Sequence, residues 1–262
     1  MNLEGVKFVA DLSIPMRFGG PQPNAYGVHE ARSEPVRAGD LIGDTRLGGS
    51  VNFEQYTFIP HCNGTHTECV GHVTHERISI RDCLKDSFTG AVLISVEPKF
   101  VDNEPLITED DLRIALAEQT AVSGDGRGFQ EKYALIVRTL PNDDDKLTRK
   151  YGIADQNAVR IPPYFTAEAV RFIVESRFRH LLTDLPSIDR LYDDGKLVNH
   201  RIFWNLEEGS FERNALTRVD SSITELIYVP DEIADGEYLL NLQIAPFDSD
   251  CAPSRPILLQ VK

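Results

Sequence analysis

Residues 61–75 read HCNGTHTECVGHVTH, and this stretch concentrates the potential metal-binding side chains of the chain. Four of the seven histidines of the protein fall within it, together with two cysteines and a glutamate. Imidazole, thiolate and carboxylate groups are the side chains that bind zinc, manganese or iron, and they seldom cluster so densely by chance. The stretch therefore predicts a metal site in this part of the chain.

An extended strand over residues 62–68 would aim part of this cluster at one point. Side chains alternate between the two faces of a strand, so four residues would share one face: Cys62, Gly64, His66 and Glu68. His66 and Glu68 would then be neighbouring ligands, and Gly64 would leave room for an ion or a substrate.

Two histidines flank this strand. Gly71 permits a turn that would bring His72 back over the same point. His61 faces away from that point unless a bulge in the strand reverses it.

The apolar pattern in the rest of the chain predicts an α/β core. Apolar, β-branched segments indicate buried strands at 91–97 and 133–139, with a third strand at 180–184. Amphipathic segments that begin with a threonine N-cap indicate helices at 108–119 and 166–177. The C-terminal part predicts three more strands, at 223–229, 236–247 and 255–261, whereas the first 50 residues predict loops and short strands. Strands and helices that alternate in this way are typical of an α/β fold.

The composition excludes several classes of protein. With 41 acidic and 27 basic residues, the formal net charge is −14, which does not suit a protein that binds the nucleic-acid backbone. No apolar run approaches the roughly 18 to 20 residues of a membrane helix. The first 15 residues lack the basic start and apolar stretch of a signal peptide. We therefore expect a soluble, cytoplasmic protein that binds neither nucleic acid nor membrane.

Two further features receive a structural interpretation. Cys69, Cys83 and Cys251 are expected to be small buried residues and not ligands. The glycine-rich segment Ser123–Gly128 precedes a strand and lacks a Lys-Ser/Thr ending, so we interpret it as a turn and not as a phosphate loop.

The string Gly64-Thr65-His66-Thr67-Glu68, followed by His72, resembles the HxGTHxDxPxH signature of the cyclase-type metal-dependent hydrolases, the family that contains bacterial kynurenine formamidase. Other segments are similar to further parts of that family: Asp11–Pro15, Pro186–Asp189, Asn199-His200, Glu225-Leu226 and Ala252–Pro256. The resemblance covers most of the chain. It implies a single domain over residues 1–262, with a layered β/β/α swivelling-type α/β fold, a barrel-like β core and a homodimeric assembly.

The resemblance also implies a site and an activity. Carried over by position, five residues would bind a divalent metal, with zinc expected first and manganese second: Cys62, His66, Glu68, His200 and Glu225. His72 would be the general acid/base. The implied reaction is hydrolysis, by metal-activated water, of an amide-type C–N bond in an aryl formamide, a cyclic amide or a related small molecule.

Several departures from the family pattern leave alternatives open. Cys62 stands where the family has its first histidine; a thiolate binds zinc well, but His61 could take over through a bulge, or the first metal position could be weakened. Glu68 replaces an aspartate, Val70 replaces a proline, and the 24 residues between His200 and Glu225 exceed the family interval. The alternatives are a catalytically degenerate binding or scaffold protein, and a zinc–thiolate site that serves a lyase or an isomerase.

Overall fold

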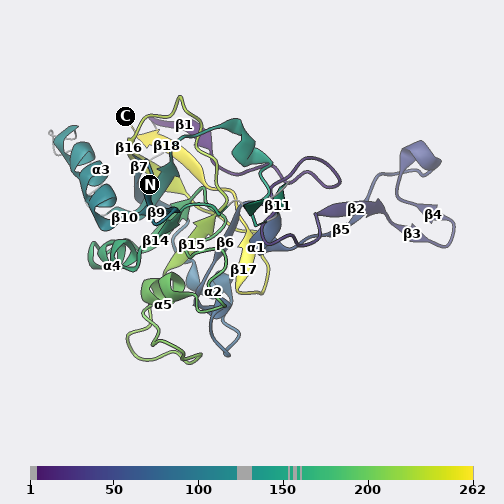
Figure 1. Cartoon of the computed structure of the whole chain (residues 1–262). Helices are drawn as coiled ribbons and strands as arrows, with labels where there is room; N and C mark the ends of the chain where they lie inside the picture. Colours follow the sequence, from purple (N-terminus) through teal and green to yellow (C-terminus); the bar gives the residue numbers. More distant parts are fainter. Residues whose placement is uncertain (1–4, 123–131, 153, 156–157, 160, 262) are drawn as a thin grey trace.

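The computed structural model describes residues 5–122, 132–152, 154–155, 158–159 and 161–261. Its centre is a mixed sheet of nine strands that curls into a half-barrel (Figure 1). In spatial order the strands are β1 (Val6–Asp11), β18 (Ile257–Val261), β16 (Gly236–Asn241), β7 (Phe88–Val96), β10 (Lys132–Thr139), β14 (His180–Thr183), β15 (Ser222–Glu225), β6 (His66–Glu68) and β17 (Cys251–Pro253). The segment Ser123–Gly128, interpreted as a turn, lies outside the described residues.

The middle of the sheet is parallel and its two margins are antiparallel. Strands β7, β10, β14 and β15 run parallel to one another. β16, β18 and β1 extend the sheet on one side, and β6 and β17 extend it on the other, through antiparallel pairs. The α/β class and the central strands predicted from the sequence are therefore confirmed.

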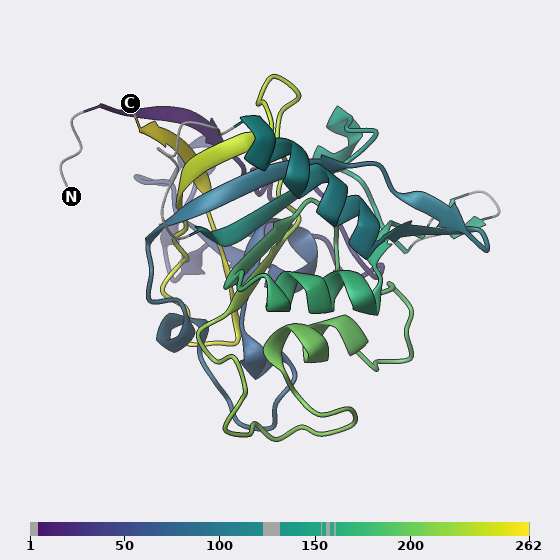
Figure 2. The same cartoon turned by 90° about the vertical axis from the view of Figure 1, so that its left-hand side faces the viewer.

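Helices cover one face of this sheet. They are α3 (Glu109–Val122), α4 (Ala167–Glu175) and α5 (Val198–Trp204), which lie in one layer in Figure 2. The first two were predicted, and their N-caps form as expected: Thr108 accepts from the backbone N–H of Asp111, and Thr166 accepts from that of Ala169. Two helices of a single turn complete the set, α1 (Pro60–Asn63) and α2 (Ile80–Cys83).

The core lies on both faces of the sheet. On β10, Leu135 and Val137 belong to the cluster beneath the helices, whereas Ala134 and Ile136 belong to a second cluster on the opposite face. A strand that is buried on both faces needs apolar residues at every position, which is why its sequence is one continuous apolar run.

Smaller elements surround the sheet. They are β2 (Arg32–Pro35) with β5 (Glu54–Thr57), β3 (Arg37–Ala38) with β4 (Leu41–Ile42), β8 (Lys99–Val101) with β9 (Glu104–Ile107) and β13 (Tyr164–Phe165), and β11 (Ala154–Asp155) with β12 (Ala158–Val159). The described residues also contain three 3-10 turns, at Thr45–Leu47, Val70–His72 and Asp144–Leu147. Strands β2 to β5 form an arm that projects from the body (Figure 1). Residues 5–50 are thus loops and short strands, as predicted.

Three expectations about strand limits were wrong. The strand predicted over residues 236–247 ends at Asn241. The predicted strand over residues 62–68 is extended only from His66, because residues 60–63 form the helical turn α1. Strand β15 ends at Glu225 and not at residue 229, because Leu226 adopts a positive φ of 53° that extended backbone does not allow. Within the described ranges, none of the helices combines the length and the hydrophobicity needed to cross a membrane.

Candidate metal centre

The candidate site is built on β6 and on its two neighbours in the sheet. In this antiparallel arrangement His66 lies opposite Glu225 of β15, and Glu68 lies opposite Cys251 of β17. Residues directly opposite one another on adjacent strands project from the same face. The pairing therefore brings the side chains of these four residues together on one face of the sheet.

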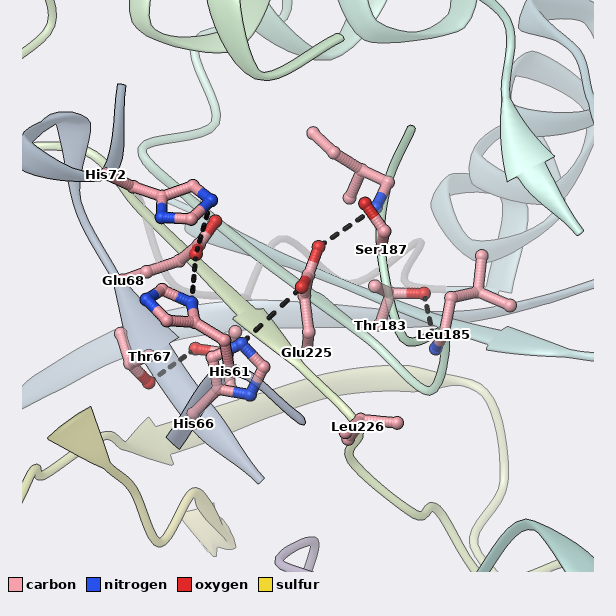
Figure 3. Close-up of polar contacts among 12 residues, drawn as sticks. His61, His66, Thr67, Glu68, His72, Thr183, Leu185, Ser187, Glu225 and Leu226 are labelled. Carbon is pink, nitrogen blue, oxygen red and sulfur yellow. Dashed lines mark hydrogen bonds and ion pairs between the residues drawn. The ribbon is translucent and has the colours of Figure 1, made fainter. Parts of the chain in front are cut away.

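The helical turn α1 brings in His61. Pro60 occupies its first turn, and the Asn63 side chain accepts a hydrogen bond from the backbone N–H of Ile59 at 2.7 Å. His61 Nδ1 lies 3.0 Å from Glu68 Oε2, and its Nε2 lies 3.0 Å from Asp250 Oδ2. His61 was expected to face away from the cluster on an extended strand. Residues 60–63 form a helical turn instead, and this turn directs the His61 ring toward the cluster (Figure 3).

The turn at Gly71 also forms, and it returns His72 to the cluster. The Cβ of any larger residue at position 71 would lie 2.2 Å from the carbonyl oxygen of Ile78, so only glycine fits this close backbone approach. His72 Nε2 lies 3.9 Å from Glu68 Oε2, and Nδ1 lies 3.3 Å from Asp250 Oδ2. Its side chain is 27% exposed, so it borders solvent.

His200 reaches the cluster from α5, where Asp189 fixes its orientation. The carboxylate of Asp189 accepts from the backbone N–H groups of Asn199 and His200, at 2.7 and 3.2 Å, and lies 2.6 Å from His200 Nδ1. The other ring nitrogen, Nε2, lies 2.9 Å from Glu68 Oε1. A carboxylate that holds one imidazole nitrogen while the other faces a site is the usual arrangement around a metal-binding histidine.

Glu225 closes the cluster on the side of β15. Its Oε1 accepts a hydrogen bond from the backbone N–H of Ile188 at 2.9 Å and lies 3.8 Å from His200 Nε2. Its Oε2 lies 3.5 Å from His66 Nε2 (Figure 3). The interval of 24 residues between His200 and Glu225 therefore does not prevent the two side chains from meeting.

The surroundings of His66 provide a test of whether a cation fits. His66 Nδ1 lies 3.0 Å from the carbonyl oxygen of Gly64, which only accepts, so Nδ1 donates to it. Among the described residues, the buried Nε2 has no hydrogen-bond partner. It lies 3.5 Å from Glu225 Oε2, within ion-pair distance. A buried imidazole nitrogen opposite a carboxylate oxygen suits two ligands of one cation.

Within the part of the chain that the structure describes, three overlapping groups of side chains could hold a metal ion. They are His61, His66 and Cys251; His61, Glu68 and His72; and His66, Glu68 and Glu225, with the ligand atoms of each group within 4.8 Å of one another. Three of the five predicted ligands thus meet in the last group, and His200 lies beside it. Cys62 belongs to none of the three groups among the described residues, whereas His61 belongs to two. Of the alternatives for the first motif position, the geometry favours His61.

The charges in the cluster depend strongly on one another. Burial alone would raise the pKa of the Glu68 carboxyl, but His72 and His200 hold that pKa well below its ordinary value. Burial would likewise lower the pKa of His200, but Glu68 and Asp189 raise it well above the usual range. Carboxylates at this depth require a compensating cation, either protonated imidazole or a metal ion.

Sequence reasoning missed three residues of the site: Asp189, Asp250 and Cys251. Cys251 was expected to be only a small buried residue, but it lies beside His61 and His66, and burial raises the pKa of its thiol to about 12. Asp250 contacts both His61 and His72. The sequence signal for Asp189 was the similarity of the segment Pro186–Asp189 to part of the cyclase-type hydrolases. The positions of Asp250 and Cys251 depend on the pairing of β17 with β6, which no local pattern reveals.

The comparison with known families identifies the chain. The model of the family described as "Putative cyclase" matches residues 10–190, which is more than half of the chain. The protein therefore belongs to the cyclase family. No curated protein sequence matches the chain.

Solved structures share this fold over nearly the whole length. A protein named as a predicted metal-dependent hydrolase from Bacillus stearothermophilus aligns with a TM-score of 0.60 and 16% identity, over 97% of this chain and 98% of that one. Isatin hydrolase A from Labrenzia aggregata aligns with a TM-score of 0.61 and 15% identity, over 99% and 95%. Isatin hydrolase A from Ralstonia solanacearum gives 0.61 and 14%, over 99% and 93%. At such identities the likeness establishes the fold.

Proposed function

We propose that this protein is a metal-dependent hydrolase of an amide-type C–N bond in a small molecule. The observation that carries the proposal is the buried Nε2 of His66, which has no hydrogen-bond partner among the described residues and faces Glu225 within a cluster of histidines and carboxylates. Membership of the cyclase family and the likeness to proteins named as metal-dependent hydrolases support it.

The proposed metal ligands come from five elements of the fold. His66 and Glu68 of β6, Glu225 of β15 and His200 of α5 were predicted from the sequence, and we add His61 of α1 and Cys251 of β17. When bound, a divalent metal polarises a carbonyl group and lowers the pKa of water from 15.7 to about 7. The thiol of Cys251 favours zinc among the candidate ions, with manganese second.

In the proposed mechanism His72 moves the proton. Asp250 accepts a hydrogen bond from His72 Nδ1, at 3.3 Å, so that Nε2 presents its lone pair as the general base. His72 takes a proton from water as the oxygen forms its bond to the carbonyl carbon. It returns that proton to the nitrogen as the C–N bond breaks. The partial exposure of the ring gives substrate access to it.

The substrate class rests on the similar structures. Two of them are named isatin hydrolases, and isatin contains a cyclic amide. We therefore propose aryl formamides and cyclic amides as the first compounds to examine. The formal charge of −14 slightly favours a neutral substrate.

Two observations bear on the alternative of a degenerate binding or scaffold protein. That alternative was motivated by the cysteine at position 62 and the glutamate at position 68. The cysteine at position 62 replaces a histidine of the family pattern, but His61 and Cys251 place other metal-binding groups beside His66. The two oxygens of Glu68 contact His200 and His61, at 2.9 and 3.0 Å, so both oxygens of the longer side chain have partners within the site. Both observations favour a working site.

The proposal is tested by turnover and metal content measured on the same samples. The wild-type protein, loaded with zinc or manganese, should hydrolyse at least one aryl formamide or lactam. His72→Ala should retain the metal and lose about 10²- to 10⁴-fold in kcat, and His66→Ala should lose both metal and activity. His75→Ala is the matched control, because His75 stacks on Phe211 at 4.8 Å and belongs to none of the three groups. A metal-loaded protein that cleaves no amide, or unchanged turnover in His72→Ala, would contradict the mechanism.

A further inference from the structure

A cavity lies outside the metal centre. Its volume is about 470 Å³, and it is lined by residues of α5 together with Arg171 of α4, Gly195, Lys196, Leu206, Glu208, Gly209 and Phe211. Pockets for small organic ligands commonly have volumes of roughly 300–1,000 Å³. The cavity is therefore large enough for a ligand of one or two rings.

The charge of this cavity is opposite to that of the whole chain. Three cationic side chains line it, Arg171, Lys196 and Arg201, against one acidic side chain, Glu208. The formal net charge of the chain is −14. A local excess of cations in an acidic protein attracts anions to that point.

Arg201 is the least exposed of the three cations, at 5%. Its guanidinium donates to the backbone carbonyls of Lys196, Glu207 and Ser210, and it lies 5.1 Å from the centre of the Phe211 ring. Within the described part of the chain, no carboxylate is found within ion-pair distance of it. Neutral partners hold the guanidinium in place but leave its positive charge uncompensated.

The rest of the lining is apolar. Val198, Ile202, Leu206 and Phe211 provide aliphatic and aromatic surface, and Phe211 is 46% exposed. An apolar wall beside a cationic group suits a ligand with an apolar body and one negative charge.

The cavity and the metal centre lie on different sides of α5. His200 is buried toward Glu68 and Asp189, whereas the neighbouring residues Val198, Arg201 and Ile202 line the cavity. A ligand in the cavity therefore need not contact the metal ligands.

We propose that this cavity is a second binding site, for a small organic anion with an apolar body, such as an aromatic carboxylate or sulfonate. The cations fix the acidic group, and the face formed by Ile202, Leu206 and Phe211 covers the ring. The site is separate from the proposed hydrolytic centre, so binding does not require turnover.

Titration calorimetry with 1-naphthalenesulfonate tests this site on the full-length protein. We expect one molecule bound per chain in the wild type, and at least about tenfold weaker binding in Lys196→Glu, equivalent to about 1.4 kcal/mol. The control is Lys7→Glu, which makes the same change of charge at an exposed position of β1. Equal weakening in both variants would mean a general effect of net charge, and it would overturn the proposal.

A second pair of variants tests the apolar half. Phe211→Ala should weaken binding several-fold, while Phe8→Ala, at an exposed phenylalanine of β1, should not. The neutral 1-naphthalenemethanol should bind at least about tenfold more weakly than the sulfonate, because it lacks the charge that the cations bind. Undetectable binding of the sulfonate, or affinity unchanged in both Lys196→Glu and Phe211→Ala, would overturn the proposal. Either result would leave the hydrolase proposal standing.

Discussion

Glu68 illustrates how single residues define this site. Its two carboxylate oxygens lie 2.9 Å from His200 and 3.0 Å from His61, so one side chain joins α5 to α1 across β6. The sequence predicted Glu68 as a ligand together with His66, because alternate residues of a strand share a face. It did not predict that the longer side chain would join two separate elements, because that depends on how far apart they lie.

Asp250 is the residue whose role is most specific to this geometry. It contacts His61 and His72, and its own pKa is held below the usual range by hydrogen bonds from both. Asp250→Asn should keep the fold and reduce kcat by about 10- to 100-fold, because an amide holds an imidazole less firmly than a carboxylate does.

The matched control for this change is Asp248→Asn, two residues earlier in the same segment. Asp248 is exposed and is not among the partners of His61 or His72. Equal losses of kcat in the two variants would show that the segment tolerates no change, and they would remove the positioning role assigned to Asp250.

At the scale of elements, the sequence predicted the central strands and the two long helices well. Strands such as β10 are buried on both faces, so their apolar runs are unbroken, and the long helices carry clear N-caps. It did not predict the turn α1, because four residues are too few for a helical period. It also could not reveal that β17 pairs with β6, since the end of β6 at Glu68 and the start of β17 at Cys251 lie far apart in the chain.

The turn at Gly71 permits a direct test of an element. Gly71→Ala would place a Cβ 2.2 Å from the carbonyl oxygen of Ile78, so the turn must move. We expect a loss of about 1–3 kcal/mol in the free energy of unfolding, measured in urea, and a displaced His72. Gly64→Ala is the comparison, since its Cβ would meet only the Met16 side chain, at 3.5 Å. Equal stability of Gly71→Ala and the wild type would contradict the close contact.

At the scale of the whole molecule, burial of a distant histidine predicts how stability depends on pH. His180 of β14 is buried, its Nδ1 lies 2.8 Å from Ser222 Oγ, and burial lowers its pKa to about 4. The unfolded chain binds this proton near pH 6.5 and the folded chain does not, so stability falls as the pH is lowered from 6.5 toward 4. At pH 5 this histidine should account for a loss of about 2 kcal/mol relative to pH 7 or above.

Urea unfolding at pH 7 and pH 5 measures this contribution. The fall in the free energy of unfolding between the two values should be smaller in His180→Asn than in the wild type. His29→Asn, at an exposed histidine, should behave like the wild type. An unchanged fall in His180→Asn would mean that His180 is not the group responsible.

Assembly is the other property of the whole molecule that the family resemblance implies. The homodimer stays a prediction, and we expect light scattering to give the mass of two chains. A mass of one chain at micromolar concentration would contradict it.

The metal content of the purified protein, measured by mass spectrometry, tests most directly whether the cluster around His66 is a metal centre. We predict about one or two zinc or manganese ions per chain in the wild type, none in His66→Ala, a reduced content in Cys251→Ala and an unchanged content in Cys62→Ala. A wild-type protein that holds no divalent metal, even after reconstitution, would contradict the metal centre and favour the binding-protein alternative.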